Sequence, residues 1–183
     1  MYTETSEKRK IMKTIIKQIA FLLLITLSFS CSNDDDDDKT RVLTDKEILQ
    51  AILDANPNNT LGWDLETTTD LGTLVGVTTN NEGQIIELVI ASRNLISIPP
   101  EIGQLTNLME LYPYQNNLTS LPPEIGQLTN LTNLELYDNQ LSVLPPEIGQ
   151  LINLEELILR INNLNTVPSE MGTLAGLTSV KNC

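Results

Sequence analysis

The sequence predicts a solenoid of the α/β class: a short horseshoe with a parallel, concave β-sheet and a helical cap at its N-terminal end. The heptapeptide Pro-Pro-Glu-Ile-Gly-Gln-Leu starts at Pro99, Pro122 and Pro145, and a weakened copy starts at Pro168, so each copy begins 23 residues after the last. Between the copies, leucines alternate with polar residues, which is the period of a half-buried strand. Units repeated at such a spacing bury their apolar faces against one another, so the chain is expected to form a stack.

A single repeat shows why the chain should fold this way. Leu134 and Leu136 flank Glu135, so one side of a short strand points into the core and the other points outward. The proline pair that starts at Pro145 interrupts strand pairing, and two apolar residues then return to the core from the convex side. The full unit reads Leu131-x-x-Leu134-x-Leu136-x-x-Asn139-x-Leu141-x-x-Leu144-Pro145-x-x-Ile148-Gly149-x-Leu151. This pattern resembles the leucine-rich repeat family over residues 85–183, as four repeats and a partial fifth.

An asparagine follows the predicted strand in most repeats. We expect its amide to turn the chain and to bond buried backbone groups of its own and the adjoining repeat. In the first repeat, Arg93 stands at this position with Asn94 beside it, so that turn must differ or shift by one residue. Pro113 replaces a core leucine of the second repeat and cannot donate to the strand ladder, which predicts local looseness there. The equivalent asparagines are Asn116, Asn139 and Asn162.

Residues 42–84 predict a cap over the first repeat. Thr44 and Glu47 form a capping box that opens one short helix. Trp63 is assigned to the core of the cap, because a lone tryptophan packs more often than it binds a ligand. Asn81–Gly83 predicts a hairpin turn leading into the first repeat. The arrangement resembles the N-terminal cap of extracellular leucine-rich repeat proteins, and it would cover a core that the first repeat otherwise exposes.

Residues 1–30 predict a secretory signal peptide. A basic segment precedes an apolar run, and that run is too short to span a hydrocarbon core, which needs about 20 residues. Met12 makes a cleaner start than Met1, because acidic residues are unusual in the positive segment of a signal and two of them follow Met1. Small residues before Cys31 place the cleavage after Ser30.

The next segment, residues 31–41, resembles the start of a mature bacterial lipoprotein, with an acidic tether. The motif is Leu27-Ser28-Phe29-Ser30-Cys31-Ser32-Asn33. It departs from the family pattern at Ser28, where leucine is usual. The resemblance implies that the Cys31 thiol is lipidated and anchors the protein to the outer membrane. Ordinary secretion, with Cys31 as a free thiol, is the alternative.

Five consecutive aspartates, Asp34 to Asp38, follow this cysteine. They lack the alternating spacing of a calcium-binding loop, so they are interpreted as a self-repelling, solvated tether. The lipoprotein resemblance adds an interpretation that is compatible with the first: in some Gram-negative groups, acidic residues after the lipidated cysteine direct the protein to the cell surface. We therefore expect an exported, lipid-anchored protein exposed on the cell surface.

Composition excludes most enzyme classes. The 183-residue chain has no histidine, which rules out serine–histidine and cysteine–histidine catalysts and histidine-ligated metal sites. Its two cysteines cannot form a disulfide framework or a four-ligand metal site. A formal charge of -13 argues against nucleic-acid binding, which needs clustered lysines and arginines. We therefore expect a non-enzymatic protein with no cofactor, no bound metal and no nucleic-acid partner.

The outward side chains of the predicted strands are the expected site of function. Equivalent positions across the repeats place tyrosines beside an arginine and an isoleucine, with carboxylates around them, which is the composition of a protein interface. We predict that a protein partner with basic patches binds this concave face. The candidate binding residues are Tyr112, Tyr114, Glu135, Tyr137, Asp138, Glu156, Ile158 and Arg160.

Three alternatives stand beside this prediction. The face is a solvated strand surface without a partner, or its tyrosines and carboxylates bind a glycan, or paired carboxylates catalyse glycoside hydrolysis. Catalysis needs a desolvated pocket that raises the pKa of a general acid, and an open face lacks one. Protein binding is the interpretation that the composition favours, and glycan binding is the second.

The fifth unit begins at Leu174 and stops at Cys183, which is expected to leave apolar surface and an open strand edge. A shortened gene product, self-association through this end and a tolerated frayed strand each explain the pattern. In an oxidising environment, Cys183 would be able to link two chains.

Overall fold

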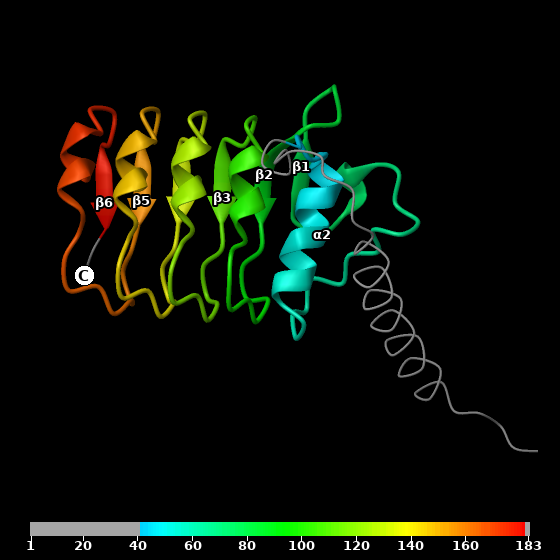
Figure 1. Cartoon of the computed structure of the whole chain (residues 1–183), viewed down its shortest axis with the longest axis horizontal. Helices are drawn as coiled ribbons and strands as arrows, with labels where there is room; N and C mark the ends of the chain where they lie inside the picture. Colours follow the sequence, from blue (N-terminus) through cyan, green and yellow to red (C-terminus); the bar gives the residue numbers. More distant parts are fainter. Residues whose placement is uncertain (1–40, 182–183) are drawn as a thin grey trace, which may run out of the picture. The chain divides into compact units, whose positions relative to one another are not determined.

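The computed structural model describes residues 41–181, and Val42 onward belongs to one compact unit, Val42–Cys183. The predicted signal peptide, Cys31, the aspartate run and Cys183 lie outside the described residues. Six strands form one sheet in chain order, which Figure 1 shows side by side. No helix within residues 41–181 is long and apolar enough to cross a membrane. The strands are β1 (Val77–Thr79), β2 (Ile85–Val89), β3 (Glu110–Tyr112), β4 (Asn133–Glu135), β5 (Glu156–Ile158) and β6 (Ser179–Lys181).

The 23-residue period sets the register of the strands. β1 pairs with β2 antiparallel, through the predicted hairpin turn, and β2 to β6 run parallel. Leu88 pairs with Leu111 and Leu111 with Leu134, so each leucine lies beside its counterpart in the next repeat. All three are at most 1% exposed. The parallel sheet with one apolar face is therefore as predicted.

Short 3-10 helices form the convex side. Proline fits the first position of a helix, because its missing N–H needs no partner there. The proline pairs predict only an interruption of strand pairing, so the helices are a finding of the structure. Those that start at the second proline of each heptapeptide are η2 (Pro100–Gln104), η3 (Pro123–Gln127) and η4 (Pro146–Gln150), with η5 (Ser169–Thr173) in the weakened copy and η1 (Leu71–Thr73) in the cap.

The glycine of each heptapeptide is required by the stacking of these helices. A Cβ atom built on Gly103 would lie 2.6 Å from the carbonyl oxygen of Glu124 in the next repeat. One built on Gly126 would lie 2.5 Å from the carbonyl oxygen of Glu147. These distances leave no room for a side chain, so the invariant glycine of the heptapeptide sets how closely the repeats approach.

The cap is built as predicted. α2 (Asp45–Ala55) begins after Thr44 and lies beside η2, the first helix of the convex side, as Figure 1 shows. The Thr44 hydroxyl accepts a hydrogen bond from the N–H of Glu47, and the Glu47 carboxylate accepts one from the N–H of Thr44. Trp63 is 8% exposed, and its indole N–H donates to the carbonyl oxygen of Val75 at 2.9 Å. Trp63 is therefore part of the core and not a ligand platform.

Two polar residues that the sequence did not single out tie the cap to the first repeat. The Asp45 carboxylate accepts a hydrogen bond from the N–H of Ile85 at 2.7 Å, so the start of α2 is bonded to β2. Asn56 is 1% exposed, and its Oδ1 accepts the N–H groups of Ile96 and Ser97 at 2.7 and 3.1 Å. Asn56 thus satisfies backbone groups at the edge of the first repeat, as the repeat asparagines do further along.

Buried asparagines join each repeat to the one before it, as predicted. Asn139 is 8% exposed, and its Oδ1 accepts the N–H of Leu118 at 3.1 Å. Its Nδ2 donates to the carbonyl oxygens of Pro113 and Leu136, both at 3.1 Å. These bonds satisfy backbone groups that burial would otherwise leave unpaired. Equivalent bonds are made by Asn116, which is also buried, and by Asn162, which is half-buried.

The turn of the first repeat lies at the same position as in the other repeats, and it contains one more left-handed residue. Ser92 has a φ of 55°, matching Gln115 at the same position of the next repeat, so the turn does not shift. Asn94 adds a second left-handed residue, with a φ of 58°. The guanidinium of Arg93 donates to the carbonyl oxygen of Thr60 at 3.2 Å. Arg93 therefore connects the repeat to the cap, which explains why this repeat departs from the asparagine pattern.

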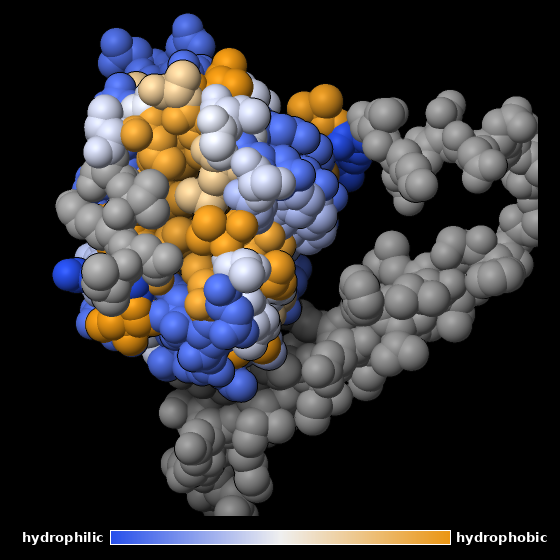
Figure 2. All heavy atoms as spheres, turned by 90° about the vertical axis from the view of Figure 1, so that its left-hand side faces the viewer, coloured by the Kyte–Doolittle hydropathy of each residue, from blue (hydrophilic) through white to orange (hydrophobic). Residues whose placement is uncertain are grey.

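The last repeat leaves apolar surface at the end of the row, as predicted. Leu164, Met171 and Leu177 are only partly buried, and Val167 is 45% exposed. Figure 2 faces this end and shows apolar atoms gathered across its middle. Within the described residues, the hydrophobic core therefore extends to this end and remains partly exposed there.

Pro113 interrupts the hydrogen bonding between β3 and β4. These strands pair at two residue positions, whereas β4 and β5 pair at three. In the next repeat, the N–H of Leu136 donates to the carbonyl oxygen of Ile158 at 2.8 Å. Pro113 has no N–H with which to make the equivalent bond. The loss of this donor is confirmed, and the looseness inferred from it stays a prediction.

Replacing Pro113 by leucine is expected to raise the melting temperature, because leucine restores both the ladder donor and the core side chain of the other repeats. A net gain of about 1 kcal/mol corresponds to roughly 2–4 °C. The matched control is Pro123→Leu, which removes an exposed proline at the start of η3 and gains no ladder bond. Its melting temperature should stay the same or fall. An unchanged or lower value for Pro113→Leu contradicts the interpretation.

Candidate binding site on the concave face

The outward side chains of β2 to β6, with those of the residues just after each strand, form what we call the concave face. The parallel register arranges these side chains in rows, each residue lying beside the one 23 positions further on. All of the candidate binding residues belong to these rows. Arg160 is exposed, and the half-buried members are Tyr112, Tyr114, Glu135, Tyr137, Asp138 and Glu156.

Tyr114, Tyr137 and Arg160 form a stack along one row. The ring centroids of the two tyrosines are 4.6 Å apart, and their planes differ by 10°. The Cζ atom of Arg160 lies 5.1 Å from the centroid of the Tyr137 ring. Both distances are close to the spacing of neighbouring strands, about 4.8 Å, so the register of the sheet holds the three groups in contact. The stack is thus formed before any partner binds, which lowers the entropic cost of binding.

Tyr112 lies in the adjoining row and is bonded to a carboxylate. Its hydroxyl donates to Oε2 of Glu110 at 2.6 Å, because residues two apart in a strand point to the same face. Burial raises the pKa of Tyr112 above its ordinary value of about 10, and the hydrogen bond to Glu110 raises it further, as do the negative charges of Glu110, Glu135 and Glu87. Tyr112 is therefore a neutral donor held in place by Glu110, a residue that the sequence prediction left out of the binding set.

Tyr137 is also neutral at physiological pH. Burial raises the pKa of Tyr137. The neighbouring Tyr114 and Glu135 raise the pKa of Tyr137 further, and the positive charge of Arg160 opposes the shift. Asp138 follows at the strand exit with a φ of 56°, and its N–H donates to the carbonyl oxygen of Arg160 at 3.0 Å. The uncharged ring of Tyr137 therefore lies between a second ring and a cation, with carboxylates around it.

Ile158 does not supply the accessible apolar contact that the sequence predicts. Its register places it on the concave face, but only 7% of it is exposed. Ile161, at the strand exit, is 63% exposed and has a φ of 55°, a conformation that β-branched residues rarely adopt. Ser92, Gln115 and Asp138, at the same position of the other turns, have φ values of 55°, 55° and 56°, so this conformation belongs to the repeat turn. The repeat pattern places Ile161 in the exit row, and its exposed apolar side chain distinguishes it from the other members of that row.

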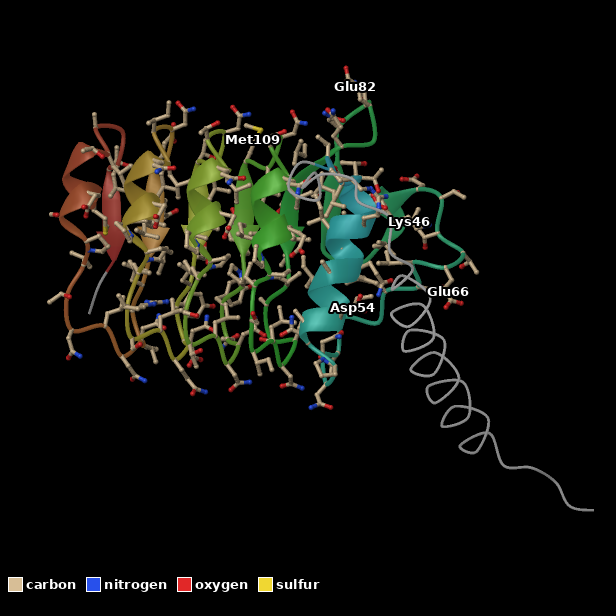
Figure 3. The ribbon with its side chains drawn as sticks, viewed as in Figure 1. Lys46, Asp54, Glu66, Glu82 and Met109 are labelled. Carbon is tan, nitrogen blue, oxygen red and sulfur yellow. The ribbon has the colours of Figure 1, made fainter. Side chains whose placement is uncertain are left out.

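The described residues offer no arrangement suited to catalysis by a metal. No three His, Cys, Asp or Glu side chains within residues 41–181 lie where they would hold a metal ion. A pocket of about 680 Å³ lies in the cap, where Figure 3 labels Lys46 and Glu82. Two of its polar side chains are bonded to the chain itself: Lys46 donates to the carbonyl oxygen of Thr68 at 2.8 Å, and Asp70 accepts the N–H of Gly72 at 3.0 Å.

Comparisons with known proteins support the same fold. No family model matches the chain, and no curated protein matches it. Among solved structures, a leucine-rich repeat protein of Leptospira interrogans is 46% identical over 56% of this chain and 26% of its own, with a TM-score of 0.50. A chain of the BIR3–SERK2 complex from Arabidopsis thaliana is 27% identical over 76% of this chain and 82% of its own, with a TM-score of 0.66. The BIR2 ectodomain from Arabidopsis thaliana is 26% identical over 75% of this chain and 78% of its own, also with a TM-score of 0.66.

The fold is that of a short leucine-rich repeat solenoid, with a parallel sheet on one side and a helical cap at its N-terminal end. This chain spans about a quarter of the length of the Leptospira protein.

Proposed function

We propose that this chain is a non-enzymatic binding module, for protein interaction or adhesion, which holds its partner on the concave face. The observation that carries the proposal is the stack of Tyr114, Tyr137 and Arg160, with its ring centroids 4.6 Å apart and its cation 5.1 Å from a ring. Tyrosine and arginine are the residue types over-represented at the energetic centres of protein interfaces. Ile161, which is 63% exposed beside Arg160, adds apolar area to the same surface.

The charge of the face sets the kind of partner. Glu110, Glu135, Asp138 and Glu156 lie around the tyrosines, and the whole chain has a formal charge of -13. Complementary charge speeds association and excludes partners of like charge. A protein that carries basic patches is therefore the partner that this surface fits.

Similar solved structures support protein binding as a class. They include a complex of two proteins and an ectodomain, both with folds that match most of this chain. An open strand face also fits binding better than catalysis, since it does not enclose a substrate or shift the pKa of a general acid by burial.

Glycan binding is the second candidate, favoured by the same stack. Sugar rings pack on aromatic faces, and neighbouring carboxylates accept hydrogen bonds from hydroxyl groups. Tyr112 and Glu110 show such a hydroxyl–carboxylate bond within the chain, at 2.6 Å.

The Tyr112→Ala, Tyr137→Ala double variant separates these candidates on protein and glycan arrays. Protein binding predicts that wild type captures proteins with basic patches, and that the double variant loses at least tenfold in affinity. The matched control is Asn153→Ala, an exposed residue whose side chain bonds only to the carbonyl oxygen of Thr129. Glycan capture by wild type that disappears in the double variant would replace protein binding by glycan binding.

We further propose that the chain is an exported lipoprotein, anchored through Cys31 to the outer membrane and exposed on the cell surface. The support is the sequence alone: a basic segment, a short apolar run, small residues before Cys31, and the aspartates from Asp34 to Asp38 as a tether and export signal.

Cys31→Ser is expected to abolish incorporation of labelled palmitate in a Gram-negative host and to move the protein from the membrane fraction to the soluble fraction. Cys183→Ser is the control and should leave both unchanged. Labelling that persists in Cys31→Ser excludes lipidation at this residue.

Replacing Asp34 to Asp38 by alanine should protect the protein from protease added to whole cells, and unchanged cleavage would exclude the export role of the aspartates.

A further inference from the structure

The stack on the concave face ends at Tyr114, one repeat short of the row's first position, which follows β2. The row that contains Tyr114, Tyr137 and Arg160 begins at Ala91, which precedes Tyr114 by the same 23 residues. The N–H of Ser92 donates to the carbonyl oxygen of Tyr114 at 3.1 Å, so the parallel register extends to this position. Ala91 is half-buried and contributes only a methyl group to the row.

The face of the Tyr114 ring on this side has no stacking partner in the described chain. Its other face lies against Tyr137, on the β4 side, with the two planes 10° apart. Within residues 41–181, this is the sole ring pair and Arg160 is the sole cation over a ring. Arg93, the basic residue nearest in sequence to Ala91, donates instead to the carbonyl oxygen of Thr60 in the cap. The position over the half-buried Ala91, one strand spacing from Tyr114, therefore holds no ring or cation of the described residues.

The chemistry around this position favours a planar cation. At the other end of the stack, a guanidinium already lies 5.1 Å from a tyrosine ring, which shows that the strand spacing suits this group. Glu110, Glu135 and Asp138 place negative charge on the same face, so a cation is favoured over an anion or a neutral ring. A guanidinium stacks flat on an aromatic ring and keeps its N–H donors free at the edge for carboxylates, which an ammonium group does not do.

We propose that Tyr114 and Ala91 form a recognition site for an arginine side chain of the protein partner, which extends the stack by one guanidinium. The proposal rests on the proposed function and specifies its partner: the basic patch contains an arginine whose side chain lies over Ala91. The resulting row has an arginine at each end and two tyrosines between them.

The test uses the compact unit Val42–Cys183, which contains the whole described core. The ligand is acetyl-Gly-Arg-Gly-amide, titrated while the ring resonances of Tyr114 are followed by NMR. The same peptides with lysine or with citrulline are the comparison, since citrulline has the shape of arginine without its charge. We expect millimolar binding of the arginine peptide, at least fivefold weaker binding of the lysine peptide, and no measurable binding of the citrulline peptide.

Two variants and one control locate the site. Ala91→Tyr fills the open position with a ring of the chain itself, and Tyr114→Leu keeps apolar bulk but removes the aromatic face. Both should lose at least fivefold in affinity for the arginine peptide, while Ala91→Ser, which leaves the position open, should bind as wild type does. Melting curves show that each variant is folded, and Tyr114→Leu tests the site if Ala91→Tyr does not fold. Equal binding of the citrulline peptide, or wild-type binding by a folded Ala91→Tyr or Tyr114→Leu variant, overturns the proposal.

A failure of the arginine site can be distinguished from a failure of the proposed function. If a protein is captured through Tyr112 and Tyr137, and folded Ala91→Tyr captures it as well as wild type does, the arginine site is wrong and the binding module stands. If the tripeptide results follow the expected pattern but no protein is captured on the concave face, the arginine site stands and the proposed function is wrong.

Discussion

Each repeat depends on a buried amide that belongs to the next one. The asparagine after a strand accepts an N–H and donates to a carbonyl oxygen of the preceding repeat, and it donates again to a carbonyl oxygen of its own turn. For Asn139, these bonds reach Leu118, Pro113 and Leu136 at 3.1 Å. The backbone at the strand exits is buried, so without these bonds it would pay the cost of unpaired polar groups. Asn56 makes comparable bonds from the cap, which is why the row of repeats can begin there.

The same stacking produces the concave face. Because equivalent residues lie one strand spacing apart, side chains that are far apart in sequence come into contact whenever their positions in the repeat agree. Tyr114, Tyr137 and Arg160 are 23 residues apart and form a continuous stack. A repeat with a different residue at that position, such as Ala91, ends the stack and leaves one face of a ring open. Variation between repeats on this face therefore creates a distinct surface without changing the scaffold.

The repeat pattern was enough to predict the strands, their parallel register, the asparagine bonds and the rows of outward residues. Those features follow from periodicity, which a sequence shows directly. The pattern did not predict the burial of Ile158, which has the register of an outward residue yet is 7% exposed. Register gives the face on which a side chain lies, and it does not give how far other residues cover that side chain. The pattern also missed Asn56 and Asp45, which lie in the cap and repeat nothing. The left-handed backbone at Ile161 recurs at the equivalent residues of the other turns, but the residue types at these positions differ and do not reveal it.

The central claim is that the buried asparagines hold the repeats together, and denaturant unfolding of Asn139→Ala tests it most directly. Removing this amide leaves a backbone N–H and two carbonyl oxygens without their partner, so the free energy of unfolding should fall by about 3 kcal/mol. Asn153→Ala is the matched control, since that exposed amide makes one bond to the carbonyl oxygen of Thr129, and it should cost about 0.5 kcal/mol or less. Equal stability losses in the two variants would contradict the claim.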